Sequence, residues 1–205
     1  MEEAFGSGRT AAGVVYFGAT RVSSTIVELR GHGSLILGCR RPPCSRLLGA
    51  LADLLSKGGL SVRLVGSIEP YRWLKLIVNA AINPVTAIAC KPNRVILEDD
   101  SARNLALALA REAFYVSKLV GVRLPTSNVE GEVVKAARAT ADNYSSMLQD
   151  IIRGRPTEID YINGAVVHAA RRKGASAPVN EAVVLSVKLL ESRGSCRMEF
   201  PLKDS

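Results

Sequence analysis

Apolar and polar positions follow two different periods along the chain, one over roughly the first third and another over the rest. Short runs rich in apolar and β-branched residues at 14–17, 25–30, 34–37 and 60–65 predict strands separated by turn residues. One helix is predicted at 45–57, where Leu47, Leu48, Leu51, Leu54 and Leu55 form a helical stripe that Gly58 and Gly59 end. The first part therefore reads as a small α/β piece.

From about residue 69 onward the apolar positions recur at helical spacing. Helices are expected at about 70–89, 101–119, 128–140, 145–153, 157–173 and 179–193, separated by glycine and proline. Asp99 and Thr157 are expected at or beside helix N-termini because their side chains can accept from free backbone N–H groups. The sequence thus predicts two domains, an α/β piece at 1–68 and an all-helical domain at 69–205.

Composition excludes several classes of protein. The 205 residues are 47% hydrophobic and 22% charged, which argues against intrinsic disorder, and 5% aromatic, which argues against a base-stacking platform. The net charge of +8 comes from scattered basic residues, so we expect a solvated surface and no nucleic-acid partner. No uncharged apolar stretch reaches about eighteen residues, and the N-terminus has no apolar signal core, so a cytoplasmic protein without membrane contact is expected.

Cysteine and histidine give no metal pattern. Cys39 and Cys44 are close in sequence, but no second pair completes a zinc set with them, and we expect reduced thiols throughout. A disulfide is the alternative if the source is a hyperthermophile. His32 and His168 have no partner at catalytic or metal-binding spacing, so both are expected to be structural and no metal is predicted.

Lys75, Asn79 and Asn83 are the most informative candidates for chemistry. In a helix they lie at i, i+4 and i+8 and share one face that is otherwise apolar. Asparagine is a poor helix former, so a row of one ammonium and two amides suggests the polar wall of a cleft. The alternative is a half-buried lysine with two asparagines that cap neighbouring helices.

A second candidate group lies at 145–164. Ser145 or Ser146 can serve as a helix cap, and Glu158 and Asp160 fall where a helix N-terminus favours carboxylates. A purely structural role therefore explains these residues as well. Acids two positions apart on a helix diverge, which argues against a glycosidase pair.

The strings KLIVNAAINPVTA (75–87), SSMLQD (145–150), TEIDYING (157–164) and PVN (178–180) resemble the C-terminal domain of the ketopantoate reductase (2-dehydropantoate 2-reductase) family. The resemblance runs over nearly all the chain. It implies an α/β remnant of a Rossmann-type nucleotide-binding domain followed by an all-α domain of the 6-phosphogluconate dehydrogenase C-terminal type. It also implies reduction of 2-dehydropantoate to pantoate with NADPH, a step toward pantothenate and coenzyme A.

The resemblance assigns a role to each candidate. Lys75 would be the general acid that hydrogen-bonds the ketone and protonates the alkoxide, which is the charge that a positioned ammonium stabilises. The substrate-binding residues it implies are Asn79, Asn83, Asn93, Ser146 and Glu158. Ser146 would hold the substrate carboxylate, and Glu158 would bind the hydroxyl and orient Lys75.

One departure from the family pattern is large. The G-x-G-x-x-G turn that binds the NADPH pyrophosphate is absent, because the Gly6 and Gly31 strings lack the third glycine, so cofactor-binding residues stay unknown. Three explanations are open: Met1 is an internal methionine of a full-length enzyme, the cofactor half is a separate chain, or the chain is a repurposed remnant. We favour the first. A homodimer or such a partner chain is expected.

Two other functions stay open. One is a non-catalytic helical module for dimerisation or ligand sensing, and the other is a related reductase of a different 2-keto acid.

Overall fold

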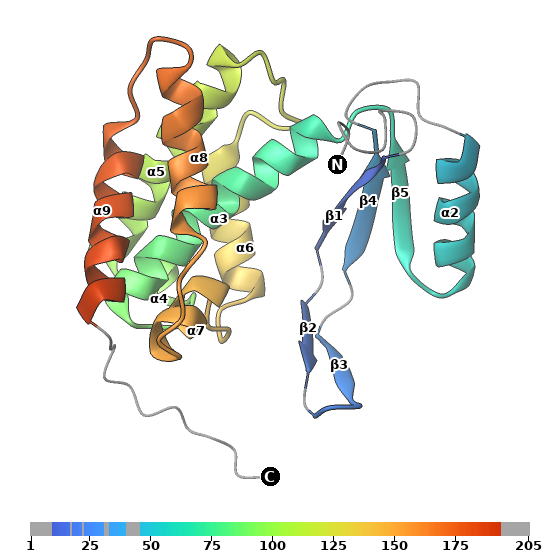
Figure 1. Ribbon diagram of the computed structural model, residues 1–205, viewed down its shortest axis with the longest axis horizontal. Coiled ribbons are helices and arrows are strands. Elements are labelled where there is room, and N and C mark those ends of the chain that lie inside the picture. Colours follow the sequence, from blue (N-terminus) through green and yellow to red (C-terminus); the bar gives the residue numbers. More distant parts are fainter. Residues whose placement is uncertain (1–9, 17, 22, 31–32, 40–45, 194–205) are drawn as a thin grey trace. The chain divides into compact units, whose positions relative to one another are not determined.

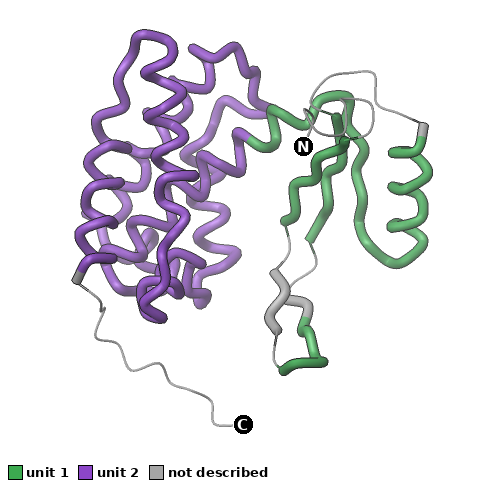
Figure 2. The backbone as a smooth tube through the Cα atoms, viewed as in Figure 1, with its two compact units in different colours: residues 1–72 green, residues 73–205 purple. Residues whose placement is uncertain are grey.

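The computed structural model describes residues 10–193 except 17, 22, 31–32 and 40–45. The expectations for Phe17, His32, Cys44, Ser45 and Cys196 lie outside the described residues. The chain divides into two compact units, Met1–Arg72 and Trp73–Ser205 (Figure 2). Each unit is considered by itself below.

A three-stranded sheet organises the first unit (Figure 1). β4 (Ser34–Gly38) lies between β1 (Ala12–Val15), which is antiparallel to it, and β5 (Ser61–Val65), which is parallel. Parallel neighbours require a crossover, and α2 (Arg46–Lys57) supplies it. β2 (Gly18–Arg21) and β3 (Val27–Arg30) form a separate antiparallel pair.

Both faces of this sheet are covered by apolar side chains. Leu37 packs with Leu48 and Ala52 of α2 on one face, and Val14 and Ile36 pack with Ile68 on the other. Gly38 is required at its position because a Cβ there would lie 2.9 Å from the carbonyl oxygen of Val65.

The leucines of α2 do not form the single buried stripe that the sequence suggests. Leu48 is buried against the sheet and Leu55 packs beside it, whereas Leu47, Leu51 and Leu54 are 79%, 44% and 67% exposed. The helix therefore has a second apolar face, at i, i+4 and i+7, that no described residue covers.

The described part of the second unit consists of helices joined by loops, with no strand. It holds α3 (Glu69–Ala89) from Trp73 onward, followed by α4 (Val95–Glu98), α5 (Asp100–Leu119), α6 (Val129–Ala139), α7 (Ser146–Ile152), α8 (Ile159–Arg171) and α9 (Pro178–Arg193). Helices α5, α8 and α9 pack against one another (Figure 1). Its largest fully buried side chains are Ile77, Ile96, Leu109, Val116, Val133, Met147, Leu148, Ile159, Asn163, Val166 and Val187.

The helix predictions are confirmed to within a few residues, and the cap at Asp99 is confirmed because its carboxylate accepts from Ala102 N at 2.9 Å. Two short elements were not predicted. β2 reads Gly-Ala-Thr-Arg and α4 is four residues long, so neither shows a hydrophobic period.

The expectation of reduced thiols is wrong for the two cysteines that the structure describes. Cys39 and Cys90 are each disulfide-bonded. Among the described residues no three His, Cys, Asp or Glu side chains gather in a way that could hold a metal ion. In the same part of the chain, no helix has both the length and the apolar character that crossing a bilayer requires.

Candidate active site on helix α3

Lys75, Asn79 and Asn83 all lie within α3, as their spacing predicts. Four residues of α-helix advance about 6 Å, so the three side chains follow one face of the helix over about 12 Å. The row descends into the protein, because Lys75 and Asn79 are half-buried and Asn83 is 8% exposed. The structure therefore places one cation and two amides along a single, partly enclosed line.

Burial changes the acidity of Lys75. Desolvation lowers the pKa of its ammonium below the usual 10.5, because a low-dielectric surrounding disfavours the charged form. A lysine with a lowered pKa gives up its proton more readily than an exposed one. This property suits a group that donates a proton to a reacting oxygen.

The side-chain amides of Asn79 and Asn83 make no hydrogen bond to any residue that the structure describes. Asn83 is 8% exposed as a residue, and its amide atoms are not among the side-chain atoms that are fully enclosed without a partner, so the amide stays accessible. The alternative that these asparagines cap neighbouring helices is therefore not observed. Two amides on one face with no hydrogen-bond partner among the described residues form a ready binding surface for a polar ligand.

Ser145 joins α7 to the buried part of α3. Its hydroxyl oxygen accepts from Leu148 N at 3.1 Å and from the Thr86 hydroxyl at 2.7 Å. Its own hydroxyl lies 3.4 Å from the carbonyl oxygen of Asn83. Ser145 is thus the helix cap, and Ser146, the next residue, is left exposed with its hydroxyl free of described partners.

Glu158 occupies the N-cap position of α8, where the sequence had suggested Thr157. Its carboxylate makes no cap bond and no ion pair within the described residues, and the Thr157 hydroxyl instead accepts from Ile159 N at 3.2 Å. No hydrogen bond joins Glu158 to Lys75. Asp160 points elsewhere and pairs with Lys188 at 2.7 Å, as the divergence of the two acids predicts.

Asn93 is buried at the junction of α4 and the end of α6. Its Nδ2 donates to the Thr140 hydroxyl at 2.8 Å, and its backbone N–H donates to the Asn143 carbonyl at 3.0 Å. Its Oδ1 is buried and has no hydrogen-bond partner among the residues that the structure describes. The structure thus gives Asn93 a fixed position and one unused acceptor.

A buried polar network behind α3 was not predicted. Asn163 of α8 donates from Nδ2 to the carbonyl of Ala80 at 2.9 Å and to Oδ1 of Asn180 at 3.0 Å. Asn180 Nδ2 in turn donates to Oε2 of Glu112 at 2.7 Å. The available signal was Pro84, since a proline inside a helix leaves the carbonyl four residues earlier without its donor.

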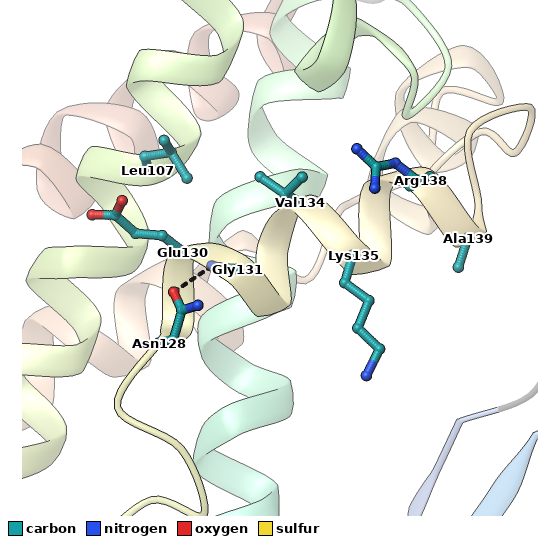
Figure 3. A pocket seen from close by; sticks show the side chains of 8 residues that line it. All are labelled: Leu107, Asn128, Glu130, Gly131, Val134, Lys135, Arg138 and Ala139. Atoms are coloured by element: carbon teal, nitrogen blue, oxygen red, sulfur yellow. Dashed lines mark hydrogen bonds between the residues drawn. The ribbon is translucent and has the colours of Figure 1, made fainter.

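An open groove lies along α6, away from the α3 row. It is lined by Leu107, Asn128, Glu130, Gly131, Val134, Lys135, Arg138 and Ala139, and it contains none of the predicted site residues (Figure 3). The side chains of Val134 and Lys135 point to opposite sides of the helix in this view. Glu130 is already paired with Arg111 at 2.8 Å. The groove therefore lacks convergent polar groups.

Residues 67–191 match the sequence model of the family described as "Ketopantoate reductase PanE/ApbA C terminal". A 2-dehydropantoate 2-reductase of Pyrobaculum aerophilum is 46% identical over 179 residues, which cover 87% of this chain and 61% of the relative. The enzyme of the same name from Pyrococcus horikoshii is 32% identical over 187 residues, which cover 91% of this chain and 62% of the relative. The chain thus spans about 60% of the length of these curated relatives.

Solved structures share the fold. The crystal structure of 2-dehydropantoate 2-reductase from Methylococcus capsulatus superposes with a TM-score of 0.83 at 28% identity and covers 96% of this chain and 63% of its own. A D-mandelate dehydrogenase in a ternary structure with NADH and anilino(oxo)acetate gives a TM-score of 0.86 at 24% identity. The match covers 94% of this chain and 63% of the dehydrogenase chain. The second likeness concerns the fold alone.

Proposed function

The chain belongs to the ketopantoate reductase family, and from that premise we propose that it carries the substrate-binding and proton-donating half of a 2-dehydropantoate 2-reductase. The proposed reaction is the NADPH-dependent reduction of 2-dehydropantoate to pantoate, in the biosynthesis of pantothenate and coenzyme A. The observation that carries the proposal is the α3 row, in which a lysine with a lowered pKa precedes two amides that have no hydrogen-bond partner in the part of the chain that the structure describes.

Lys75 acts as the general acid. Reduction of a ketone develops negative charge on its oxygen, and a positioned ammonium stabilises that charge and supplies the proton. Its Nζ hydrogen-bonds the ketone oxygen and transfers a proton to it. Partial burial favours this transfer, because it lowers the pKa of the ammonium.

The remaining site residues bind the substrate. Asn79 and Asn83 offer amides to its polar groups from the same helix face as Lys75. Ser146 binds the carboxylate with its exposed hydroxyl, and the exposed carboxylate of Glu158 binds the substrate hydroxyl. The buried unused acceptor of Asn93 gives it the same kind of role.

NADPH is the proposed cofactor, and when bound it supplies the hydride. The residues present do not form its site: the sequence contains no G-x-G-x-x-G string, and no described strand-to-helix turn offers a glycine-rich cradle for a pyrophosphate. We therefore assign no cofactor-binding residue and derive no step through the cofactor.

The α/β unit is proposed to be part of a Rossmann-type nucleotide-binding domain. Its parallel β4–α2–β5 segment has the connectivity of such a domain. Partners of two kinds are consistent with its exposed features: a second copy of this chain, or a chain that carries the cofactor half. The apolar face of α2 and the edge of β5, which pairs with one described strand, support such pairing.

The proposal is tested by titrating NADPH fluorescence on the purified chain, with and without 2-dehydropantoate, and by following NADPH consumption. We expect 2-dehydropantoate to bind, and any consumption of NADPH to vanish in Lys75→Ala. Ligand binding without consumption would favour the non-catalytic ligand-sensing module. A chain that binds neither compound contradicts both functions.

A further inference from the structure

Pro84 leaves a gap in the hydrogen bonding of the helix that carries the α3 row. In a helix, the N–H of residue 84 would donate to the carbonyl of Ala80, but proline has no N–H. Ala80 is fully buried, so water does not reach this carbonyl to replace the donor. The gap lies one residue after Asn79 and three before Asn83, within the proposed substrate site.

Asn163 of α8 supplies the missing donor. Its Nδ2 lies 2.9 Å from the Ala80 carbonyl oxygen, which is ordinary hydrogen-bond geometry. Asn163 is itself fully buried, and its second Nδ2 hydrogen is used by Asn180 Oδ1 at 3.0 Å. Both of its donors are therefore committed, and the side chain cannot turn without losing one of them.

The same chain of hydrogen bonds continues to α9 and α5. Asn180 donates from Nδ2 to Glu112 at 2.7 Å, and the Glu112 carboxylate also accepts the backbone N–H groups of Val179 at 3.1 Å and Asn180 at 2.8 Å. These N–H groups lie in the first turn of α9, so Glu112 caps that helix. Three helices are thus joined to one carbonyl of α3.

We propose that Asn163 is a positioning residue for substrate binding, acting on Asn79 and Asn83 through the Ala80 carbonyl. This rests on the proposed function, since it assumes that the two amides bind substrate. Asn163 does not touch the substrate itself. Its work is to replace the donor that Pro84 removes, and so to hold the backbone between the two amides in one conformation.

Pro84 provides an internal control for this role. In Pro84→Ala the N–H of residue 84 is restored and can donate to Ala80, so the donor from Asn163 becomes redundant. A merely structural Asn163, important for core stability alone, gains nothing from that change. The two substitutions are therefore expected to be coupled, and their effects are not expected to add.

The experiment compares wild type, Asn163→Leu, Pro84→Ala and the double variant by hydrogen–deuterium exchange without ligand and by 2-dehydropantoate titration in the presence of NADPH. Asn163→Leu is expected to speed amide exchange in α3 and to weaken 2-dehydropantoate binding by about tenfold, the equivalent of one buried hydrogen bond. The double variant is expected to recover most of both losses. Asn128→Ala, which removes the α6 cap bond to Gly131 N, serves as the matched control for general destabilisation.

Faster exchange spread equally over α3, α5 and α6 would overturn the proposal, and so would a double variant no better than Asn163→Leu. If Asn163→Leu does not fold, recovery of a folded protein in the double variant supports the role, and failure of both to fold overturns it. If the wild type binds no 2-dehydropantoate, the proposed function fails, whereas the exchange pattern still decides what Asn163 does to α3.

Discussion

The hydroxyl groups of Thr86 and Ser145 lie 2.7 Å apart and join the buried part of α3 to the start of α7. Thr86 is fully buried, and its hydroxyl oxygen also lies 2.9 Å from the carbonyl oxygen of Asn83. The contact therefore fixes the first turn of α7, which carries Ser146, relative to the turn of α3 that carries Asn83. Two adjacent serines are left with different tasks, one structural and one free for a ligand.

Ser145→Ala and Ser146→Ala should separate these tasks. Ser145→Ala removes the cap of α7 and the buried hydrogen bond between Ser145 and Thr86, so it should lower the free energy of unfolding by about 1–3 kcal/mol. Ser146→Ala should leave stability within about 0.5 kcal/mol, because the side chain is exposed, and should weaken 2-dehydropantoate binding. Urea unfolding and calorimetric titration measure the two effects, and the reverse assignment would show that the cap is Ser146.

Asn83→Leu should change the free energy of unfolding little and weaken the binding of 2-dehydropantoate strongly. The amide of Asn83 has no described partner, so replacing it by an apolar group of similar shape removes no protein hydrogen bond. The free energy of unfolding should change by less than about 1 kcal/mol, whereas 2-dehydropantoate affinity should fall at least about tenfold. Asn128→Ala is the opposite control, since it should lose stability through the α6 cap and keep affinity.

The pH dependence should follow Lys75. A lowered pKa means that the ammonium loses its proton below 10.5, so proton donation and anion binding should both decline as pH rises through that lowered pKa. In the interval between the folded and unfolded pKa values the unfolded chain binds more protons, so stability should rise with pH there. Lys75→Met should abolish both trends. A wild-type affinity that shows the same dependence on pH as that of Lys75→Met contradicts the assignment.

Reduction should destabilise the chain through Cys39 and Cys90. Both are disulfide-bonded, and a disulfide typically contributes about 2–4 kcal/mol. Under denaturing, non-reducing conditions neither residue should react with an alkylating reagent, as peptide mass mapping can show. After reduction both should react and the melting temperature should fall. Alkylation of either cysteine before reduction would contradict the bonding found here.

The row of Lys75, Asn79 and Asn83 could be predicted because its period matches a long, strongly apolar helix. The same reasoning could not decide whether the asparagines were caps or ligand groups, since that depends on which partners the fold brings near them. At the start of α8, Thr157 accepts from Ile159 N as its place beside the helix N-terminus predicts, whereas the choice of Glu158 as the N-cap residue depends on the local backbone.

The hydrogen-bond network of Asn163 could not be predicted from the sequence pattern. Pro84 shows that a carbonyl lacks its donor, but the donor comes from a residue 83 positions from Ala80, which no local period reveals. Similarly, the spacing of the α2 leucines shows that they can form a helical stripe, but which of them are covered depends on the elements that the fold packs against the helix. Cysteine pairing also depends on distance in space, so composition could not predict it.

The most direct measurement is a calorimetric titration of 2-dehydropantoate into this chain with NADPH present, for wild type and Asn83→Leu. The account predicts saturable binding at one site per chain, weakened at least about tenfold by the substitution. Absence of saturable binding in a folded wild-type chain, or equal affinity in the two proteins, would contradict the claim that the face of α3 binds this substrate.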